Sequence, residues 1–148
     1  MTISGGLTPP WWAYRSFGRT SPARGGCYVG PTLCVDVDPK SAIAREEIFG
    51  PVCCVIPYED DEQAVRIAND SIYGLSGSVY SPDEARALGV ARRIRAGTIS
   101  VNGGQWFHAD TPFGGYRQSG VGRENGEQGF AEHLQTKVIA LPGGTASG

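Results

Sequence analysis

The fold is decided by residues 77–101, which read GSVYSPDEARALGVARRIRAGTISV. Two short apolar runs, Gly77–Tyr80 and Thr98–Val101, stand at the ends of this stretch and predict strands. The residues between them have the capping pattern and the apolar spacing of a helix. A strand, a helix and a strand in this order predict two parallel strands with a covering helix.

The helix in this stretch is predicted to begin at Ser81. Ser81 is placed as the N-cap, Pro82 takes the first helical position, and Glu84 completes a capping box. Gly97 is interpreted as the glycine that follows the end of the helix. The apolar face of the helix is predicted from Ala85, Leu88, Ala91 and Ile94.

A second unit of the same kind is predicted just before the first. Val52–Pro57 is a short apolar strand that follows a Gly-Pro turn. Acidic residues occupy positions 59–62, where the dipole of a helix N-terminus favours negative charge. This helix is expected to end around Asn69-Asp70. Its apolar face is predicted from Ala64, Ile67 and Ala68.

Two such units in succession predict an α/β fold, with a mostly parallel sheet and covering helices. A further helix is expected over roughly Glu124–His133, and a last strand over Thr136–Leu141. Residues 1–26 contain arginines but no acid and are interrupted by prolines, so an irregular leader is expected there. Residues 143–148 are expected to be a flexible tail.

The composition excludes several classes of function. The length of 148 residues fits one domain, since domains usually have roughly 100–150 residues. The net charge of −2 provides no field that would attract nucleic acid or an anionic membrane. No apolar run approaches the roughly 18 residues of a membrane-spanning helix. Neither nucleic acid nor a membrane is therefore expected as a partner.

The four cysteines are expected to be small buried side chains. Cys27, Cys34, Cys53 and Cys54 form no CxxC pair and lie far in sequence from both histidines, so no metal site is predicted. Cys53 and Cys54 are adjacent in a predicted strand and should point to opposite faces of it. This use of cysteine indicates a cytoplasmic protein.

Two other stretches are candidates for chemistry. Residues 112–124 read PFGGYRQSGVGRE, whose glycines lack the GxGxxG spacing of a dinucleotide loop, so a tight loop of several turns is predicted. Residues 44–51 read AREEIFGP, which suits recognition of sugar hydroxyls beside a flat ring. A surface acid pair next to a core phenylalanine explains the same pattern. No arrangement of serine, histidine and aspartate predicts a nucleophile.

Together these stretches resemble the C-terminal portion of the NAD(P)-dependent aldehyde dehydrogenase superfamily. The resemblance runs from about Gly26 to Leu141 and implies that residues 27–134 are part of the catalytic domain. Residues 135–142 then include a strand of the kind that joins subunits. An unrelated small α/β domain is the alternative. The motifs, in order, are Gly30-Pro31-Thr32, Arg45–Pro51, Ala68-Asn69-Asp70, Tyr73-Gly74-Leu75, Arg95–Thr98, Val101-Asn102, Pro112–Glu124 and Thr136-Lys137.

The resemblance implies a role for the acid pair and the ring that follows it. Glu47 resembles the family residue that accepts hydrogen bonds from the nicotinamide-ribose hydroxyls. Phe49 resembles the ring that lies beside the nicotinamide. The implied cofactor is NAD or NADP, between which this sequence does not discriminate.

The resemblance also implies a substrate channel. Phe113 resembles an aromatic residue that lines the path of the aldehyde. Trp106 and Phe107 fall where the family varies this lining, which implies a hydrophobic or aromatic aldehyde. Glu124 resembles an acid proposed to relay protons at the back of the site.

The nucleophile of the family is a cysteine in a Gly-Gln-x-Cys setting, and none of the four cysteines here has that setting. The reaction needs a thiolate to attack the aldehyde, a hydride acceptor and a base that activates water. We therefore expect a fragment that is inactive alone and binds NAD weakly. The alternative is a non-catalytic module that pairs through Thr136–Leu141 with itself or with a complete aldehyde dehydrogenase subunit.

Overall fold

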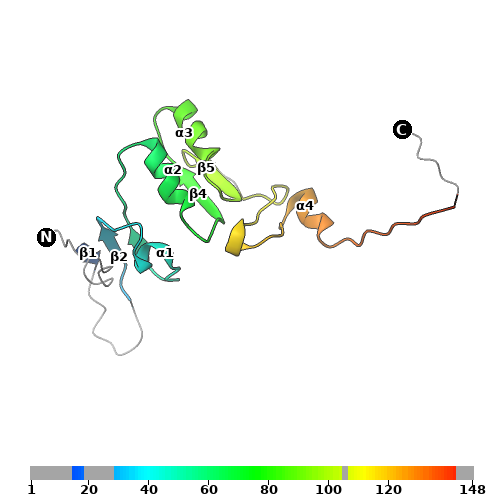
Figure 1. Ribbon diagram of the computed structural model, residues 1–148, viewed down its shortest axis with the longest axis horizontal. Helices are drawn as coiled ribbons and strands as arrows, with labels where there is room; N and C mark the ends of the chain where they lie inside the picture. The colour runs from blue at the N-terminus through cyan, green and yellow to red at the C-terminus, as the bar shows by residue number, and fades with distance from the viewer. Residues whose placement is uncertain (1–14, 19–28, 105–106, 143–148) are drawn as a thin grey trace. The chain divides into compact units, whose positions relative to one another are not determined.

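The computed structural model describes residues 15–18, 29–104 and 107–142 (Figure 1). These residues fall into two compact units. The first extends to Ile72 and includes Arg92–Arg95, and the second contains Tyr73–Ala91 and the chain from Ala96 onward. The predictions for Cys27, Trp106, the tail 143–148 and most of the leader 1–26 lie outside the described residues.

A sheet of three strands forms the base of the first unit. Strand β1 (Arg15–Gly18) pairs antiparallel with β2 (Thr32–Val35), which pairs parallel with β3 (Val52–Cys54). The expectation of an irregular leader does not hold for Arg15–Gly18, because β2 provides these residues with a hydrogen-bonding partner. Strand β3 is shorter than the predicted Val52–Pro57. Cys34 and Val37 are buried, with 1% and 2% of their surfaces exposed.

The cysteines follow the alternation that the sequence predicts, but not all of them are buried. Cys34 is buried, Cys54 is half-buried and Cys53 is exposed. Cys53 and Cys54 differ because neighbouring residues of a strand point to opposite faces. The prediction of burial is therefore correct for Cys34 and wrong for Cys53.

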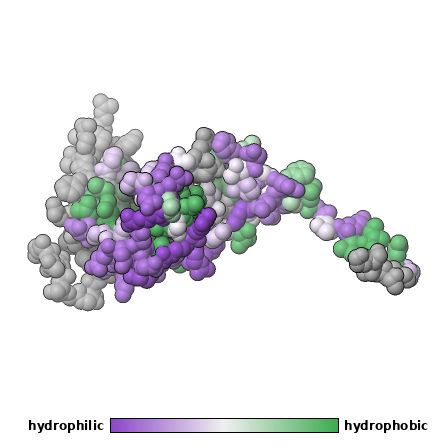
Figure 2. All heavy atoms as spheres, turned by 90° about the horizontal axis from the view of Figure 1, so that it is seen from above, coloured by the Kyte–Doolittle hydropathy of each residue, from purple (hydrophilic) through white to green (hydrophobic). Residues whose placement is uncertain are grey.

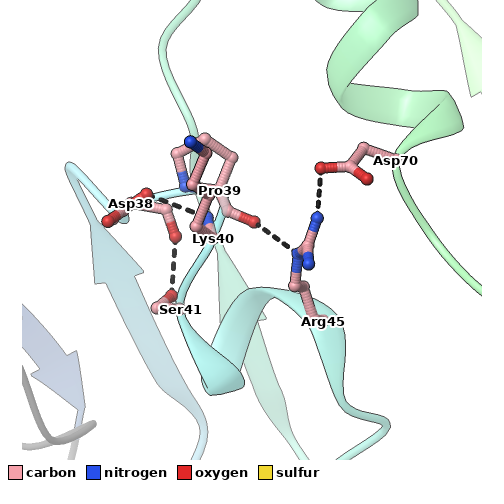
Figure 3. A network of polar contacts seen from close by, with 6 residues as sticks. All are labelled: Asp38, Pro39, Lys40, Ser41, Arg45 and Asp70. Atoms are coloured by element: carbon pink, nitrogen blue, oxygen red, sulfur yellow. Dashed lines mark hydrogen bonds and ion pairs between the residues drawn. The ribbon is translucent and has the colours of Figure 1, made fainter. Parts of the chain in front are cut away.

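A network of polar contacts holds the single-turn helix α1 (Ala42–Arg45) in place (Figure 3). The Asp38 carboxylate accepts a hydrogen bond from the Lys40 backbone N–H at 2.8 Å, and the Asp38 carbonyl accepts one from the Ser41 hydroxyl at 2.6 Å. At the other end of α1, the Arg45 guanidinium forms an ion pair with Asp70 (Figure 3). The turn before α1 and the helix itself are thus tied to the rest of the unit.

The backbone is strained at Phe49, a few residues after the end of α1. Phe49 has a φ of 53°, in the left-handed region that a bulky side chain rarely adopts. Its side chain is nevertheless 92% exposed, so no packing in the first unit compensates for the strain. The alternative of a core phenylalanine at this position is therefore wrong.

Helix α2 (Asp61–Asn69) forms where the acidic run predicts it. Asp60 caps it, since its carboxylate accepts a hydrogen bond from the Gln63 N–H at 2.7 Å. The buried residue of this helix is Val65, whereas Ala68 from the predicted apolar face is exposed. Ala64 and Ile67 are half-buried, so the prediction of the apolar face is correct for these two residues, wrong for Ala68 and incomplete without Val65.

Residues Arg92–Arg95 are attached to α2 in the first unit. The Asn69 side chain donates a hydrogen bond to the Arg93 carbonyl at 2.9 Å and accepts one from the Arg95 N–H at 2.7 Å. The Arg93 guanidinium forms an ion pair with Glu62. The hydrogen bond from Arg93, followed by its positive charge, lowers the pKa of Glu62 below its ordinary value.

The second unit contains the predicted strand, helix and strand. Strands β4 (Ser76–Val79) and β5 (Thr98–Val101) pair parallel, and helix α3 (Glu84–Ala91) packs against both (Figure 1). The register places Ser76 opposite Thr98 and Val79 opposite Val101. The other predicted unit does not close in this way, because β3 pairs with β2 in a separate sheet.

Helix α3 begins later than predicted, because Asp83 rather than Ser81 caps it. The Asp83 carboxylate accepts a hydrogen bond from the Arg86 N–H at 3.1 Å, and its carbonyl accepts one from Ala87 at 3.0 Å. Ser81 instead accepts a hydrogen bond from the Asp83 N–H at 3.2 Å. The buried residues of α3 are Ala87 and Ala91. The prediction of a buried face is therefore correct for Ala91 but wrong for Ala85 and Leu88, which are exposed.

Gly97 does not terminate a helix, since α3 ends at Ala91. Its role is to allow another part of the second unit to approach closely. A Cβ atom built on Gly97 would lie 1.7 Å from the Gly114 carbonyl oxygen, which is far too short for two atoms that are not bonded to each other. The glycine is therefore required by contact between two backbone segments.

The last elements are a short helical turn, η2 (Arg117–Ser119), and helix α4 (Gly126–Ala131). Helix α4 confirms the predicted helix but is shorter than Glu124–His133. The predicted strand at Thr136–Leu141 pairs with no strand among the described residues and has no regular structure. Its apolar side chains suit a strand, but a strand also needs a neighbour to bond with its backbone.

Replacement of Gly97 tests the close backbone contact. Gly97→Ala is expected to lower the free energy of unfolding by about 1–3 kcal/mol, because the added methyl group must displace backbone atoms. Gly89→Ala is the matched control, since a Cβ atom there meets nothing within 4 Å. Within α3 it should raise stability by roughly 0.5–1 kcal/mol. Urea unfolding followed by circular dichroism measures both, and equal effects would contradict the contact.

Replacement of Phe49 tests the backbone strain. Phe49→Asn is expected to raise the free energy of unfolding by about 1 kcal/mol, because asparagine tolerates the left-handed region and the exposed ring contributes no packing. Ile48→Asn is the control, since Ile48 does not have a positive φ. Chemical denaturation compares the two, and a gain that is no larger at position 49 than at position 48 would refute the strain.

Candidate functional site

The loop between β5 and α4 brings two of the predicted site residues together. Phe113 and Glu124 form an antiparallel backbone bridge, with Phe113 N–H donating to the Glu124 carbonyl at 2.8 Å and the reverse bond at 2.7 Å. Residues that exchange both hydrogen bonds lie directly opposite each other. Residues 112–124 thus fold back on themselves, as the glycine-rich pattern predicts.

A third predicted residue, Phe107, completes an aromatic pair with Phe113. The ring centroids are 5.7 Å apart and the ring planes meet at 76°, which is the edge-to-face arrangement that aromatic pairs favour. Phe107 is 58% exposed and Phe113 is half-buried, so one ring supports another that faces outward. Trp106, the remaining predicted residue of this lining, lies outside the described residues.

Arg123 shapes this loop, although the sequence analysis assigned it no role. Its guanidinium donates hydrogen bonds to the carbonyls of Gly115 at 3.0 Å and Gly122 at 2.8 Å. It also lies over the Tyr116 ring, 5.6 Å from the centroid, within the range of a cation–π interaction. Its hydrogen-bond partners are backbone carbonyls, and Arg117 is a second cation in the same stretch, so the residue pattern alone does not single Arg123 out.

Glu47 and Phe49 belong to the first unit, between α1 and β3. The backbone is extended at Glu46, the residue after α1, and Glu47 is exposed to solvent. Two residues later, the exposed Phe49 ring stands on the strained backbone described above. Strained residues persist where the surrounding structure imposes them, and they are frequent at binding sites.

The described residues offer no activated nucleophile. Burial, and then the neighbouring Cys34 and Cys53 thiols, raise the pKa of Cys54, which disfavours the reactive thiolate. Both histidines are exposed. No three histidine, cysteine or acidic residues in the described part of the chain come together as a metal site would require. Within the same residues, no helix has the length and apolar character needed to cross a membrane.

The sequence of this chain is similar to those of known proteins. The profile of the aldehyde dehydrogenase family matches residues 15–139. A geranial dehydrogenase from Castellaniella defragrans is 48% identical over 126 residues, covering 85% of this chain and 26% of that protein. A 3-succinoylsemialdehyde-pyridine dehydrogenase from a Pseudomonas species is 48% identical over 122 residues, covering 82% of this chain and 25% of that protein.

Solved structures match in the same way. An aldehyde dehydrogenase from Mycobacterium tuberculosis in complex with NAD+ has a TM-score of 0.79 and 43% identity, over 92% of this chain and 29% of that one. A mutant of aldehyde dehydrogenase C from Pseudomonas syringae, bound to NAD+ and octanal, has a TM-score of 0.79 and 45% identity, over 86% and 27%. The alternation of parallel strands and helices thus matches part of the aldehyde dehydrogenase fold.

The chain spans about a quarter of the length of the curated relatives it matches. The match nevertheless covers most of the chain itself and includes both stretches that carry the candidate site residues. The chain therefore belongs to the aldehyde dehydrogenase family.

Proposed function

We propose that this chain contributes to the NAD(P)-dependent oxidation of an aldehyde to a carboxylic acid, as the C-terminal part of a catalytic domain. The observation that carries this proposal is the Phe49 ring, which is 92% exposed on a strained backbone beside an exposed carboxylate. A flat apolar ring next to a hydrogen-bond acceptor suits a nicotinamide and its ribose hydroxyls.

In the first unit, Glu47 and Phe49 are the proposed cofactor-binding residues. With a cofactor bound, the Glu47 carboxylate would accept hydrogen bonds from the ribose hydroxyls, and the Phe49 ring would lie beside the nicotinamide. The bound cofactor supplies the hydride acceptor. NAD+ is present in the related structures from Mycobacterium tuberculosis and Pseudomonas syringae, which supports a nicotinamide ligand.

In the second unit, the aromatic pair Phe107–Phe113 is the proposed substrate lining, with Trp106 as a further lining residue. An exposed ring held by an edge-to-face neighbour provides an apolar surface, which supports a hydrophobic or aromatic aldehyde. Glu124, fixed opposite Phe113 by the backbone bridge, is proposed to relay protons. Its exposed carboxylate is accessible to water.

This chain alone is proposed to be inactive and to bind NAD weakly. No cysteine among its 148 residues stands in a Gly-Gln-x-Cys setting, and the pKa of Cys54 is raised rather than lowered. Without a thiolate that attacks the carbonyl, no thioester forms and no hydride is transferred. Two side chains at one end of a dinucleotide also provide few contacts.

A chimera tests the role of Glu47. The matched 126 residues of the Castellaniella geranial dehydrogenase are replaced by those of this chain, and NADH formation is followed at 340 nm. Glu47→Gln should raise the KM for NAD+ about tenfold, since losing a hydrogen bond to a charged group costs roughly 1.5 kcal/mol. Glu46→Gln, a substitution of the adjacent acid, should leave the KM for NAD+ unchanged.

Two outcomes would refute the assignment. Equal KM values for the two glutamine variants would show that Glu47 does not bind the cofactor. NADH formation by the isolated chain with an aldehyde would show that the nucleophile lies within these residues.

A second role as an assembly module is supported by the residues after α4. Val138, Ile139 and Leu141 are 86%, 76% and 78% exposed, on a segment that has no regular structure. Figure 2 shows this hydrophobic surface along the chain just before its grey end. Exposed apolar side chains on an unpaired backbone favour pairing with another strand. We propose a complete aldehyde dehydrogenase subunit as the partner.

Substitution within this segment tests the assembly role. The chain is mixed with a full-length relative, the Castellaniella geranial dehydrogenase, and complex formation is measured by size-exclusion chromatography. Val138→Asp should abolish co-elution, because a charge replaces a side chain that is buried on pairing. Gln135→Asp, on a residue that is already polar, should leave it intact. Separate elution of the unmodified chain and the enzyme would refute this role.

A further inference from the structure

Three cysteines of the first unit lie on two neighbouring strands. The parallel register of β2 and β3 sets Cys34 opposite Cys54, and Leu33 opposite Cys53. Partners in register on neighbouring strands have their side chains on the same face. Cys34 and Cys54 therefore share one face of the sheet, and Cys53 shares the other face with Leu33.

The exposure of these residues agrees with the register. Cys34 is buried, with 1% of its surface exposed, and Cys54 is half-buried, whereas Leu33 and Cys53 are both exposed. The Cys54 thiol also donates a weak hydrogen bond to the Ile43 carbonyl at 3.5 Å. The Cys34–Cys54 pair thus lies between the sheet and the segment that contains α1.

We propose that Cys34 and Cys54 are an oxidisable dithiol, which a peroxide converts into a disulfide between β2 and β3. Neighbouring strands lie about 4.8 Å apart, within the roughly 4.4–6.8 Å that separates the Cα atoms of disulfide-bonded cysteines. Cys54 is the member of the pair with solvent access, so it is the thiol that the oxidant reaches first. Its raised pKa leaves little thiolate at neutral pH, so the oxidation is slow and becomes faster as the pH rises.

The oxidation proceeds in two balanced steps. The Cys54 sulfur attacks one peroxide oxygen, the O–O bond breaks, and a sulfenic acid and water form. The Cys34 sulfur then attacks the Cys54 sulfur, the S–O bond breaks, and the leaving hydroxide takes up the thiol proton as a second water. In total, two thiols and hydrogen peroxide give one disulfide and two water molecules.

Cys53 does not compete as the partner of either thiol. It is adjacent to Cys54 in sequence but points to the opposite face, where its partner in the register is Leu33. Oxidation of Cys53 therefore stops at the sulfenic acid or at a mixed disulfide with a small thiol. The inference does not depend on the proposed function, because it requires only the register and the exposure of the cysteines.

Peptide mapping of the full chain tests this inference. The reduced chain is treated with hydrogen peroxide, remaining thiols are blocked with iodoacetamide, and the chain is digested with trypsin without reduction. Cleavage after Lys40 and Arg45 separates Cys34 from Cys54. The expected product is residues 25–40 linked to residues 46–66, lighter by two hydrogen atoms than the two peptides combined when each has only its second cysteine blocked.

A double variant assigns the link, because each of these peptides contains two cysteines. In Cys27→Ser/Cys53→Ser only Cys34 and Cys54 remain, and the link should form at the rate seen in the unmodified chain. A link that disappears or slows in this variant would overturn the inference. Cys54→Ser should remove the link while Cys53→Ser retains it, and the opposite pattern would also overturn it.

Discussion

The second unit depends on a set of backbone hydrogen bonds at Gly74, where three segments of the chain meet. The Gly74 carbonyl accepts hydrogen bonds from the N–H groups of Gly97 at 3.0 Å and Tyr116 at 2.9 Å, while its own N–H donates to the Ser119 hydroxyl at 3.1 Å. Gly97 is also in close contact with the Gly114 backbone, which leaves no space for a side chain at position 97. The loop 112–124 is therefore positioned by its hydrogen bonds with Gly74, just before β4, and by the close approach of Gly114 to Gly97, just before β5. Phe113 lies in this loop, so the same contacts position the aromatic pair.

The parts of the fold that the sequence predicts well are those with local causes. Helix α2 begins inside an acidic run that also contains its capping residue, Asp60. The elements β4, α3 and β5 alternate within a short stretch. Errors arise where two residues offer the same local chemistry. Ser81 and Asp83 can both cap a helix, and only the hydrogen bonds to Arg86 and Ala87 distinguish them. Which face of a helix is buried, and which strand pairs with β3, are decided by distant residues and carry no local signal.

The candidate site also has some features that local sequence indicates and others that depend on residues far apart in the chain. The resemblance to the family provided Glu47, Phe49, Phe113 and Glu124, and their residue types alone would not have distinguished them from an ordinary surface. The Phe113–Glu124 bridge and the contact between Phe107 and Phe113 join residues separated in sequence. Arg123 was missed because its partners are carbonyl groups, which no side-chain pattern reveals.

The segment with Glu47 and Phe49 is fixed at both ends, which explains how it maintains a strained residue without packing around it. At its start, Arg45 is held by the ion pair with Asp70. At its end, the Pro51 carbonyl accepts a hydrogen bond from the Thr32 N–H at 2.8 Å, so β3 begins in a fixed register with β2. A short segment between two fixed points has few conformations available, and an unfavourable φ is retained when the anchors together contribute more than it costs, about 1–3 kcal/mol. The exposed ring is thus presented by the scaffold in advance, which lowers the ordering entropy that a flat ligand would otherwise have to overcome on binding.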